Sequence, residues 1–188
     1  MKNPVISIIL PIHNQADHVR SIVDQYEAIL QKLPSPYELI LVVNGCRDAS
    51  LRICQELAQK YPTVRAIETP KGGWGRAVKM GIAQARGETI CFTNSARTTA
   101  NDLLLFILYA IANPDIVIKA NRKIRDGWMR RLGSLLYNIE CRTIYDLSNW
   151  DMNGTPKVFP RKFKNFLDLK RDDDLIDLEF NCVSKDAQ

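Results

Sequence analysis

Val5-Ile6-Ser7-Ile8-Ile9-Leu10 and Leu39-Ile40-Leu41-Val42-Val43 are the two stretches that decide the fold of this chain. The first runs into the polar tip Pro11-Ile12-His13-Asn14, and the second into Asn44-Gly45-Cys46-Arg47-Asp48. Short runs of β-branched and aliphatic residues bounded by turn residues indicate strands buried on both faces, as in a parallel sheet. Ligands of open α/β sheets bind just beyond the carboxyl ends of such strands. The two tips therefore predict the position of the site.

The composition is that of an ordinary globular domain. The 188 residues are 46% hydrophobic and 25% charged, which excludes a disordered chain. No apolar stretch reaches the roughly 18 residues that span a bilayer, and the N-terminus lacks the anatomy of a signal peptide. The five cysteines are odd in number and show no Cys-x-x-Cys spacing, so we expect reduced thiols in a cytoplasmic protein and no zinc site.

Positive charge is concentrated in the third quarter of the chain. The net charge is +5, yet residues 119–171 carry 13 basic and 5 acidic side chains, a net of +8. Such a stretch predicts an anionic partner: phosphate, an anionic lipid surface or nucleic acid. A solvated cationic face is the alternative. Because no nucleic-acid-binding motif accompanies the charge, we expect no nucleic-acid partner.

Strand and helix patterns alternate from residue 5 to residue 120. We expect strands at 5–10, 38–43, 64–68, 89–93 and 115–120, with helices at about 14–33, 49–60, 74–87 and 102–112 between them. This alternation predicts an α/β fold with a mostly parallel central sheet flanked by helices. Asn14 with Asp17 is expected to cap the first helix.

Beyond residue 120 the alternation stops. Residues 128–147 predict an amphipathic helix, followed by a Pro-interrupted basic stretch at 156–164 and an acidic tail. We expect the apolar face of the helix to pack in the core, with contact between Trp128 and a membrane interface as the alternative.

Several motifs, in order and in register, resemble the inverting family 2 glycosyltransferases of the GT-A fold. They are Pro11-Ile12-His13-Asn14, then Val43-Asn44-Gly45-Cys46-Arg47-Asp48-Ala49-Ser50, then Gly73-Trp74-Gly75-Arg76-Ala77 ahead of Ala85-Arg86-Gly87. The resemblance implies one GT-A domain over 1–188, with a nucleotide-sugar-binding half at 1–118 and an acceptor-side half at 119–188. The family usually continues beyond this point, so the acceptor half is expected to be truncated or minimal. The implied reaction is transfer of a sugar from a nucleotide-sugar donor with inversion.

The second half resembles the branch that acts on dolichol or polyprenyl phosphate. Ala120-Asn121-Arg122, Arg130-Arg131-x-x-Ser134 with Asn138, Asp151-Met152-Asn153-Gly154 and Asp177-Leu178-Glu179 carry this looser likeness. It implies a polyprenyl-phosphate acceptor, and a protein peripheral to the inner membrane face. Arg122, Arg130, Arg131 and Lys157 are then the candidates for the acceptor phosphate. If the acceptor is a hydroxyl, a carboxylate base is needed instead, and Asp151 or Asp177 is the best choice.

The resemblance also implies a set of donor-binding residues at the strand tips. They are Pro11, His13, Asn14, Gln15, Val43, Asn44, Asp48, Gly73, Arg76, Asn94 and Ser95. Local structure explains some of them equally well. Asp48 is a plausible helix cap, and the glycines at 72–75 suit helix entry as well as phosphate binding.

Five positions at which the family carries carboxylates hold neutral residues here. They are Gln15, Val43, Asn44, Asn94 and Ala96, the last two standing at the metal-binding Asp-x-Asp. Mg²⁺ and Mn²⁺ need carboxylate oxygens, so we expect no resident metal and a fixed cation, Arg97, against the donor diphosphate. A metal held by Asn94 and donor oxygens is one alternative. The other is a non-catalytic protein that still binds nucleotide sugars.

Overall fold

The computed structural model describes residues 5–121 and 128–186, apart from the side chains of Arg130, Arg131 and Asp186. The strands are β1 (Ile6–Ile12), β2 (Tyr37–Asn44), β3 (Val64–Thr69), β4 (Thr89–Phe92), β5 (Ile118–Lys119) and β6 (Lys157–Pro160). The helices are α1 (Val19–Leu30), α2 (Ser50–Lys60), α3 (Trp74–Gln84), α4 (Ala100–Ala112), α5 (Trp128–Tyr145) and α6 (Ile176–Asp186), with a 3-10 helix η1 (Lys164–Asp168).

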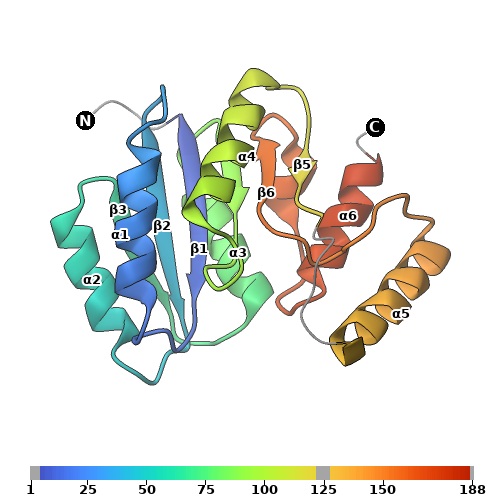
Figure 1. The fold of residues 1–188 in the computed structure, drawn as a ribbon, viewed down its shortest axis with the longest axis horizontal. Helices are drawn as coiled ribbons and strands as arrows, with labels where there is room; N and C mark the ends of the chain where they lie inside the picture. Colours follow the sequence, from blue (N-terminus) through green and yellow to red (C-terminus); the bar gives the residue numbers. More distant parts are fainter. Residues whose placement is uncertain (1–4, 122–127, 187–188) are drawn as a thin grey trace.

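The strands form one sheet in the order β3-β2-β1-β4-β6-β5 (Figure 1). β1 pairs in parallel with β2 and with β4, and β2 pairs in parallel with β3. β6 is antiparallel to both of its neighbours. The predicted α/β class with a mostly parallel sheet is therefore confirmed, and the carboxyl ends of β1, β2 and β4 meet at one edge.

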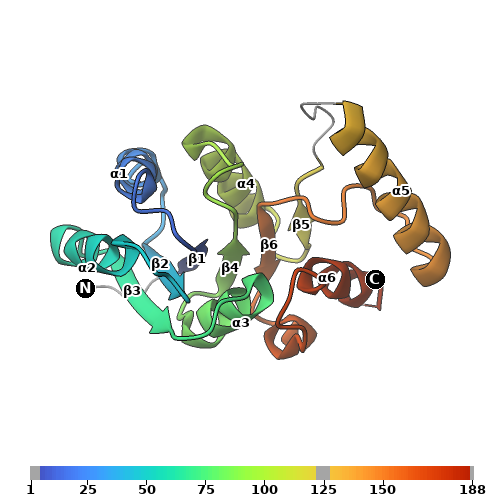
Figure 2. The same cartoon turned by 90° about the horizontal axis from the view of Figure 1, so that it is seen from below.

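Helices cover both faces of the sheet (Figure 2). Side chains of α1, α2 and α4 pack on one face in a core that includes Val23, Leu57 and Ile107. Side chains of α3, η1 and α6 pack on the other in a core that includes Val78, Phe166 and Phe180. The central strand β1 supplies residues to both cores because successive side chains of a strand point to opposite faces.

The second half of the chain adds a strand that the sequence did not predict. β6 lies between β4 and β5, so β5 is held in the sheet only through a strand that comes later in the chain. Lys157 and Pro160 made this stretch read as a basic loop. β5 is also shorter than expected, with two residues in place of 115–120.

Two predicted helix boundaries are wrong. α1 begins at Val19, and its first turn has no side-chain cap, so the pair Asn14 and Asp17 does not cap it. Asn14 instead takes a left-handed backbone conformation with φ +50° and turns the chain at the end of β1. α3 ends at Gln84 rather than at Gly87.

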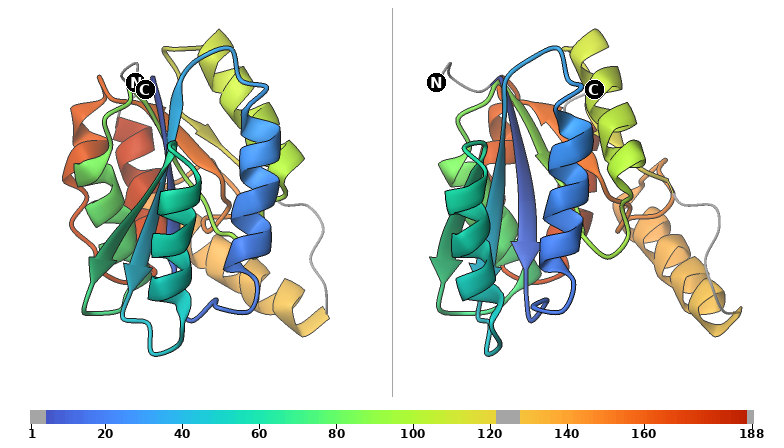
Figure 3. Two further views of the ribbon diagram at one scale, coloured as in Figure 1. Left: turned by 90° about the vertical axis from the view of Figure 1, so that its left-hand side faces the viewer. Right: turned by 60° about the vertical axis from the view of Figure 1, so that its left-hand side comes forward.

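The expectation that the apolar face of α5 packs in the core is also wrong. α5 stands out from the sheet at one side of the molecule (Figures 1 and 3). Among its described side chains, Asn138 and Cys141 are buried and Tyr137 packs partly buried against a small cluster that includes Cys141, while the other large apolar ones are exposed by 46% or more. These exposed side chains, the apolar stripe of α5, are Trp128, Met129, Leu132, Leu135, Leu136, Ile139, Ile144 and Tyr145. Among the described helices, none has the length and apolar content required to cross a membrane.

Candidate functional site

The loops that follow β1 and β2 are tied together by hydrogen bonds. The ring Nδ1 of His13 lies 2.7 Å from the carbonyl oxygen of Asn44. Because a carbonyl only accepts, Nδ1 carries the proton, and Nε2 is left to accept from the amide of Asn14 at 3.2 Å. Asn14 Oδ1 in turn accepts the N–H of Arg47 at 2.8 Å. His13 and Asn14 are exposed, so both are placed to meet a ligand at this edge.

Asn44 joins the tip of β2 to two other segments. Its Nδ2 donates to the carbonyl of Ile12 at 2.8 Å, and its Oδ1 accepts the N–H of Gly73 at 3.1 Å. Asn44 is only 3% exposed. The side chain of Val43 lies in the core, and Pro11 is buried within β1. These three residues are therefore buried beneath the loops and support the edge of the sheet.

Asp48 fixes the loop before α2. Its Oδ2 accepts the N–H of Ala16 at 2.9 Å, and its Oδ1 accepts the N–H of Ser50 at 3.0 Å. Hydrogen bonding, chiefly from the side chain of Ser50, holds the pKa of Asp48 below its ordinary value of 3.8. The carboxylate thus contacts the first N–H of α2 and connects it to the loop after β1. The N-cap position of α2 is Ala49, without a side-chain cap, so Asp48 is not the helix cap that the sequence predicted.

The tip of β4 forms a tight polar turn beside these loops. Ser95 donates its hydroxyl proton to Gln15 Oε1 at 2.7 Å, which joins the first tip to the fourth. Asn94 Oδ1 accepts the N–H of Ala96 at 2.9 Å, and the Asn94 carbonyl accepts the N–H of Arg97 at 3.2 Å. The turn leaves the side chain of Arg97 exposed.

A cleft of about 260 Å³ opens at this turn. The residues lining it come from the loop after β4, the start of α3, the segment before β6 and the start of α6: Trp74, Asn94, Arg97, Asn153, Thr155, Asp174 and Asp177. Three of the predicted site residues therefore meet, namely Asn94, Arg97 and Asp177. The cation stands on the donor side, and the two carboxylates stand on the side formed by the second half of the chain.

Asp177 is held from two directions within this cleft. Lys157 Nζ forms a short ion pair with Asp177 Oδ1, and the indole N–H of Trp74 donates to Asp177 Oδ2 at 3.1 Å. Lys157 has no exposed surface, whereas Asp177 is 5% exposed and lines the cleft. Lys157, which the resemblance placed against an acceptor phosphate, thus lies behind a carboxylate.

The remaining acceptor candidates are placed as follows. Asp151 is 4% exposed, has φ +54°, and is not among the residues that line the cleft. Arg122 lies outside the described residues. Arg130 and Arg131 lie on α5, and their side chains are likewise outside the description. Of the two predicted bases, the structure brings Asp177 and not Asp151 to the cleft.

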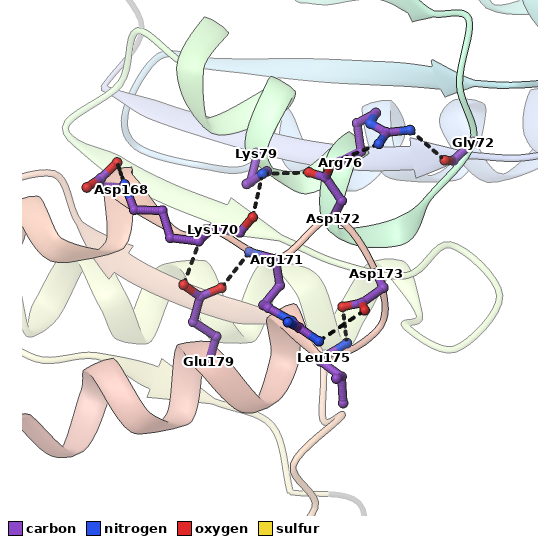
Figure 4. Close-up of polar contacts among 10 residues, drawn as sticks. All are labelled: Gly72, Arg76, Lys79, Asp168, Lys170, Arg171, Asp172, Asp173, Leu175 and Glu179. Carbon is purple, nitrogen blue, oxygen red and sulfur yellow. Dashed lines mark hydrogen bonds and ion pairs between the residues drawn. The ribbon is translucent and has the colours of Figure 1, made fainter.

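The Gly-rich turn is covered by the segment between η1 and α6, as Figure 4 shows. Arg76 pairs with Asp172 Oδ2 at 2.7 Å, and its backbone N–H donates to the Asp172 carbonyl at 3.0 Å. Lys79 pairs with the other carboxylate oxygen at 2.6 Å. A Cβ on Gly73, which has φ +142°, would lie 2.7 Å from the same carbonyl. The glycines thus permit close packing, and Arg76 is directed at Asp172.

The predicted site residues lacked four that line this cleft: Trp74, Asn153, Thr155 and Asp174. Trp74 and Asn153 lie in motifs that carry the family likeness, but no role was assigned to either. Asp174 belongs to a run of acidic residues that was interpreted as a tail. Thr155 gave no signal, because its place depends on β6. A larger hollow of about 620 Å³ lies beside β5, and none of the predicted site residues in the described part of the chain lines it.

Sequence comparison finds relatives among enzymes that act on lipid phosphates. The chain is 27% identical over 139 residues to an undecaprenyl-phosphate 4-deoxy-4-formamido-L-arabinose transferase of Pseudomonas fluorescens, covering 71% of this chain and 40% of the relative. It is 28% identical over 102 residues to a dolichyl-phosphate beta-glucosyltransferase of Trichomonas vaginalis, covering 51% of this chain and 30% of the relative. The chain thus spans less than half the length of these relatives.

Comparison with solved structures supports the fold. Glucosyl-3-phosphoglycerate synthase from Mycobacterium tuberculosis, in complex with Mn²⁺, UDP-glucose and phosphoglyceric acid, aligns with a TM-score of 0.72 and 16% identity, covering 98% of this chain and 68% of that one. A mannosyltransferase from Pyrobaculum calidifontis, in complex with GDP-mannose and Mn²⁺, aligns with a TM-score of 0.59 and 18% identity, covering 93% and 51%. Both show the GT-A fold that the motifs predicted. Residues 7–166 match the sequence profile described as glycosyl transferase family 2, and the chain belongs to that family.

Proposed function

We propose that this chain binds a nucleotide-activated sugar across the tips of β1, β2 and β4 and transfers the sugar with inversion to an acceptor in the cleft. The observation that carries the proposal is the cleft itself, because it joins Arg97 and Asn94 on the donor side to Asp177 on the other. Family membership and the nucleotide-sugar complexes of the structural neighbours support it. The rest of the predicted donor set lies on the same edge, with His13 and Asn14 exposed.

In this scheme the guanidinium of Arg97 binds the donor diphosphate and offsets its negative charge. A guanidinium binds phosphate oxygens in a bidentate manner and keeps its charge at every relevant pH. Asn94 offers one neutral oxygen, and Ala96 offers none. The residues present therefore suit a fixed cation better than Mg²⁺ or Mn²⁺, which prefer carboxylates. A metal held by Asn94 together with donor oxygens is the competing scheme.

The acceptor that fits best with the relatives is a polyprenyl phosphate. A phosphate monoester is already an anionic nucleophile, so it needs cations rather than a general base. The sequence supplies Arg122, Arg130 and Arg131 in the basic segment. Asp177 at the cleft favours a second candidate, a hydroxyl acceptor whose proton would pass to that carboxylate. Transfer to undecaprenyl phosphate, compared with transfer to a panel of polyols, distinguishes the two.

The apolar stripe of α5 fits a lipid acceptor. A helix that exposes tryptophan and leucine in a basic part of the chain is typical of a protein lying in the surface of an anionic membrane. Asn138, a buried residue of α5, accepts the N–H of Met152 through Oδ1 at 3.1 Å. Because Asn153 lines the cleft, a membrane-bound α5 would bring the acceptor side of the cleft to the lipid surface. These features support our proposal of a protein bound peripherally at the inner face of the membrane.

Donor transfer measured with EDTA and with Mn²⁺ tests the catalytic proposal. Activity should survive EDTA and fall by at least about tenfold in Arg97→Ala, because one charge-assisted contact to the diphosphate is lost. Arg52→Ala, at an exposed arginine of α2 that pairs with Glu56, is the matched control and should keep full activity. A strict Mn²⁺ requirement would contradict the role of Arg97. Donor binding without turnover on any acceptor would identify a non-catalytic nucleotide-sugar-binding protein.

Vesicle flotation tests the membrane proposal. The wild-type protein should float with vesicles of phosphatidylglycerol and not with those of phosphatidylcholine, and Leu135→Asp with Leu136→Asp should abolish flotation. Leu105→Asp is the matched control, since Leu105 is a leucine of α4 that is 64% exposed. Equal flotation of all three proteins would show that α5 is not the contact.

A further inference from the structure

Lys157 is a lysine without exposed surface at the first position of β6. Its ammonium lies 5.5 Å from the ring centre of Phe92 and 5.7 Å from that of Phe180. Lysine is almost never fully buried unless it is paired, since removing a charge from water costs several kcal/mol. The ion pair with Asp177 supplies such a partner for its charge.

Asp177 is in turn fixed by elements that are distant in sequence. Trp74, at the start of α3, donates its indole N–H to Oδ2, and Lys157, on β6, is bound to Oδ1. The carbonyl of Asp177 accepts from Asn181 Nδ2 at 2.6 Å within α6. Trp74 and Asp177 line the cleft, whereas Lys157 is behind it. The three side chains therefore connect the Gly-rich loop to the wall made by the second half of the chain.

We propose that Lys157 is a positioning residue of the transfer site, which acts through Asp177 rather than on an acceptor phosphate. It orients the carboxylate, with Trp74 bound to the other oxygen, so that Asp177 accepts a hydrogen bond from a substrate hydroxyl in the cleft. A carboxylate has about four acceptor positions, so two bonds to the protein leave capacity for such a hydroxyl. The catalytic consequence rests on the proposed function, but the position of Asp177 does not.

Tryptophan fluorescence tests the position of Asp177 without any substrate. The chain has three tryptophans, and replacing the exposed Trp128 and Trp150 by Phe leaves Trp74 as the single reporter of the bond to Asp177. In this background Lys157→Met should shift the emission maximum, because the carboxylate that accepts the indole N–H loses its partner at Oδ1.

The charged and titratable groups described near Asp177 belong to different elements. Besides Lys157, they include Arg97 after β4 and Asp174 before α6, which line the same cleft, and Tyr137 of α5. Asp177→Asn alone should also shift the emission, and Lys157→Met should add little to that shift, because both changes act through the same side chain. Additive shifts of the two changes, or no shift in Lys157→Met, would overturn the proposal.

Stability measurements keep the test decisive if Lys157→Met folds poorly. That variant should lower the melting temperature by roughly 5 °C or more, and adding Asp177→Asn should restore much of the loss, because removing both charges of a buried pair is far less costly than removing one. Lys162→Met, at a lysine whose side chain is 52% exposed, is the matched control and should leave the melting temperature unchanged. Additive losses at 157 and 177 would overturn the pairing.

Activity then separates positioning from bulk stability. Lys157→Met should lower kcat by about tenfold or more, because a misplaced carboxylate no longer meets the substrate, and leave the donor KM within about twofold. A rise in the KM for acceptor phosphate with an unchanged kcat would instead make Lys157 a phosphate ligand. If the chain has no transferase activity, the proposed function fails while the fluorescence result stands on its own.

Discussion

Asn44 binds Ile12 and Gly73 with opposite ends of one side-chain amide. Its Nδ2 donates to the Ile12 carbonyl at 2.8 Å, and its Oδ1 accepts the Gly73 N–H at 3.1 Å. A carboxylate at this position could replace the acceptor but not the donor. The resemblance implies an aspartate at this position, and in this chain the amide makes two contacts that a carboxylate could not both make.

Replacing Asn44 by Asp should therefore be destabilising. The change places a carboxylate oxygen against the Ile12 carbonyl in a site that is 3% exposed, and we expect a loss of about 1–3 kcal/mol in the free energy of unfolding. Urea denaturation followed by circular dichroism measures it. Asn165→Asp, at an exposed asparagine of η1, is the control and should differ from wild type by less than about 0.5 kcal/mol. Equal stability of the two variants would show that the amide donor is dispensable.

Two glycines on helices should respond to alanine in opposite ways. A Cβ on Gly75 would lie 2.5 Å from the Arg171 carbonyl and 2.6 Å from that of Asp173, whereas a Cβ on Gly133 would meet nothing within 4 Å. Gly75→Ala should cost about 1–3 kcal/mol of stability by overpacking. Gly133→Ala should add roughly 0.5–1 kcal/mol, because alanine is the better helix former. A melting temperature of Gly75→Ala at or above that of wild type would contradict the close approach of the backbone at 171–173 to Gly75.

The sequence predicted the half of the fold that rests on local patterns. Unbroken aliphatic runs predict buried strands such as β1 and β2, and the ends of these runs predict where the strand tips lie. β6 could not be predicted in this way, since its lysine is compensated by Asp177, twenty residues further along the chain. The same long-range contact hid the role of Lys157. The prediction that the apolar face of α5 packs in the core failed for another reason. The pattern of α5 is amphipathic, but such a pattern does not say whether the rest of the protein packs against its apolar face.

The contact between Asp172 and the start of α3 should make stability depend on pH in the acid range. Hydrogen bonding, chiefly from Lys79, holds the pKa of Asp172 below its ordinary value of 3.8. A carboxyl whose pKa is lower in the folded state stabilises the protein above the ordinary value, and this contribution is lost as the pH falls through the folded value. The urea midpoint of Asp172→Asn should thus lie below that of wild type at pH 6 and approach it at pH 3.

Salt and a neighbouring residue provide the controls for Asp172. The side chain is 49% exposed, so 0.5 M NaCl should reduce the difference at pH 6 by screening. Asp168→Asn, at an exposed carboxylate that pairs with Lys170, should match wild type at both pH values. A difference for Asp172→Asn that is the same at pH 3 and pH 6 would mean that its charge is not what holds the segment.

Restoring the two aspartates at the tip of β4 should create a metal site where we propose that Arg97 serves instead. Asn94 and Ala96 lie two residues apart in one turn, with Asn94 in the cleft and Ala96 exposed. Asn94→Asp with Ala96→Asp supplies the carboxylate oxygens that Mn²⁺ prefers, and it also places negative charge beside Arg97. We expect calorimetry to show Mn²⁺ binding by the double variant at least about tenfold tighter than by wild type or by Ala96→Asp alone.

Transfer that resists EDTA in wild type should become dependent on Mn²⁺ in the double variant, because the carboxylates repel a metal-free diphosphate. If wild type already binds Mn²⁺ as tightly as the double variant, Arg97 is not the substitute for a metal, and the neutral residues at 94 and 96 leave a functional metal site in place.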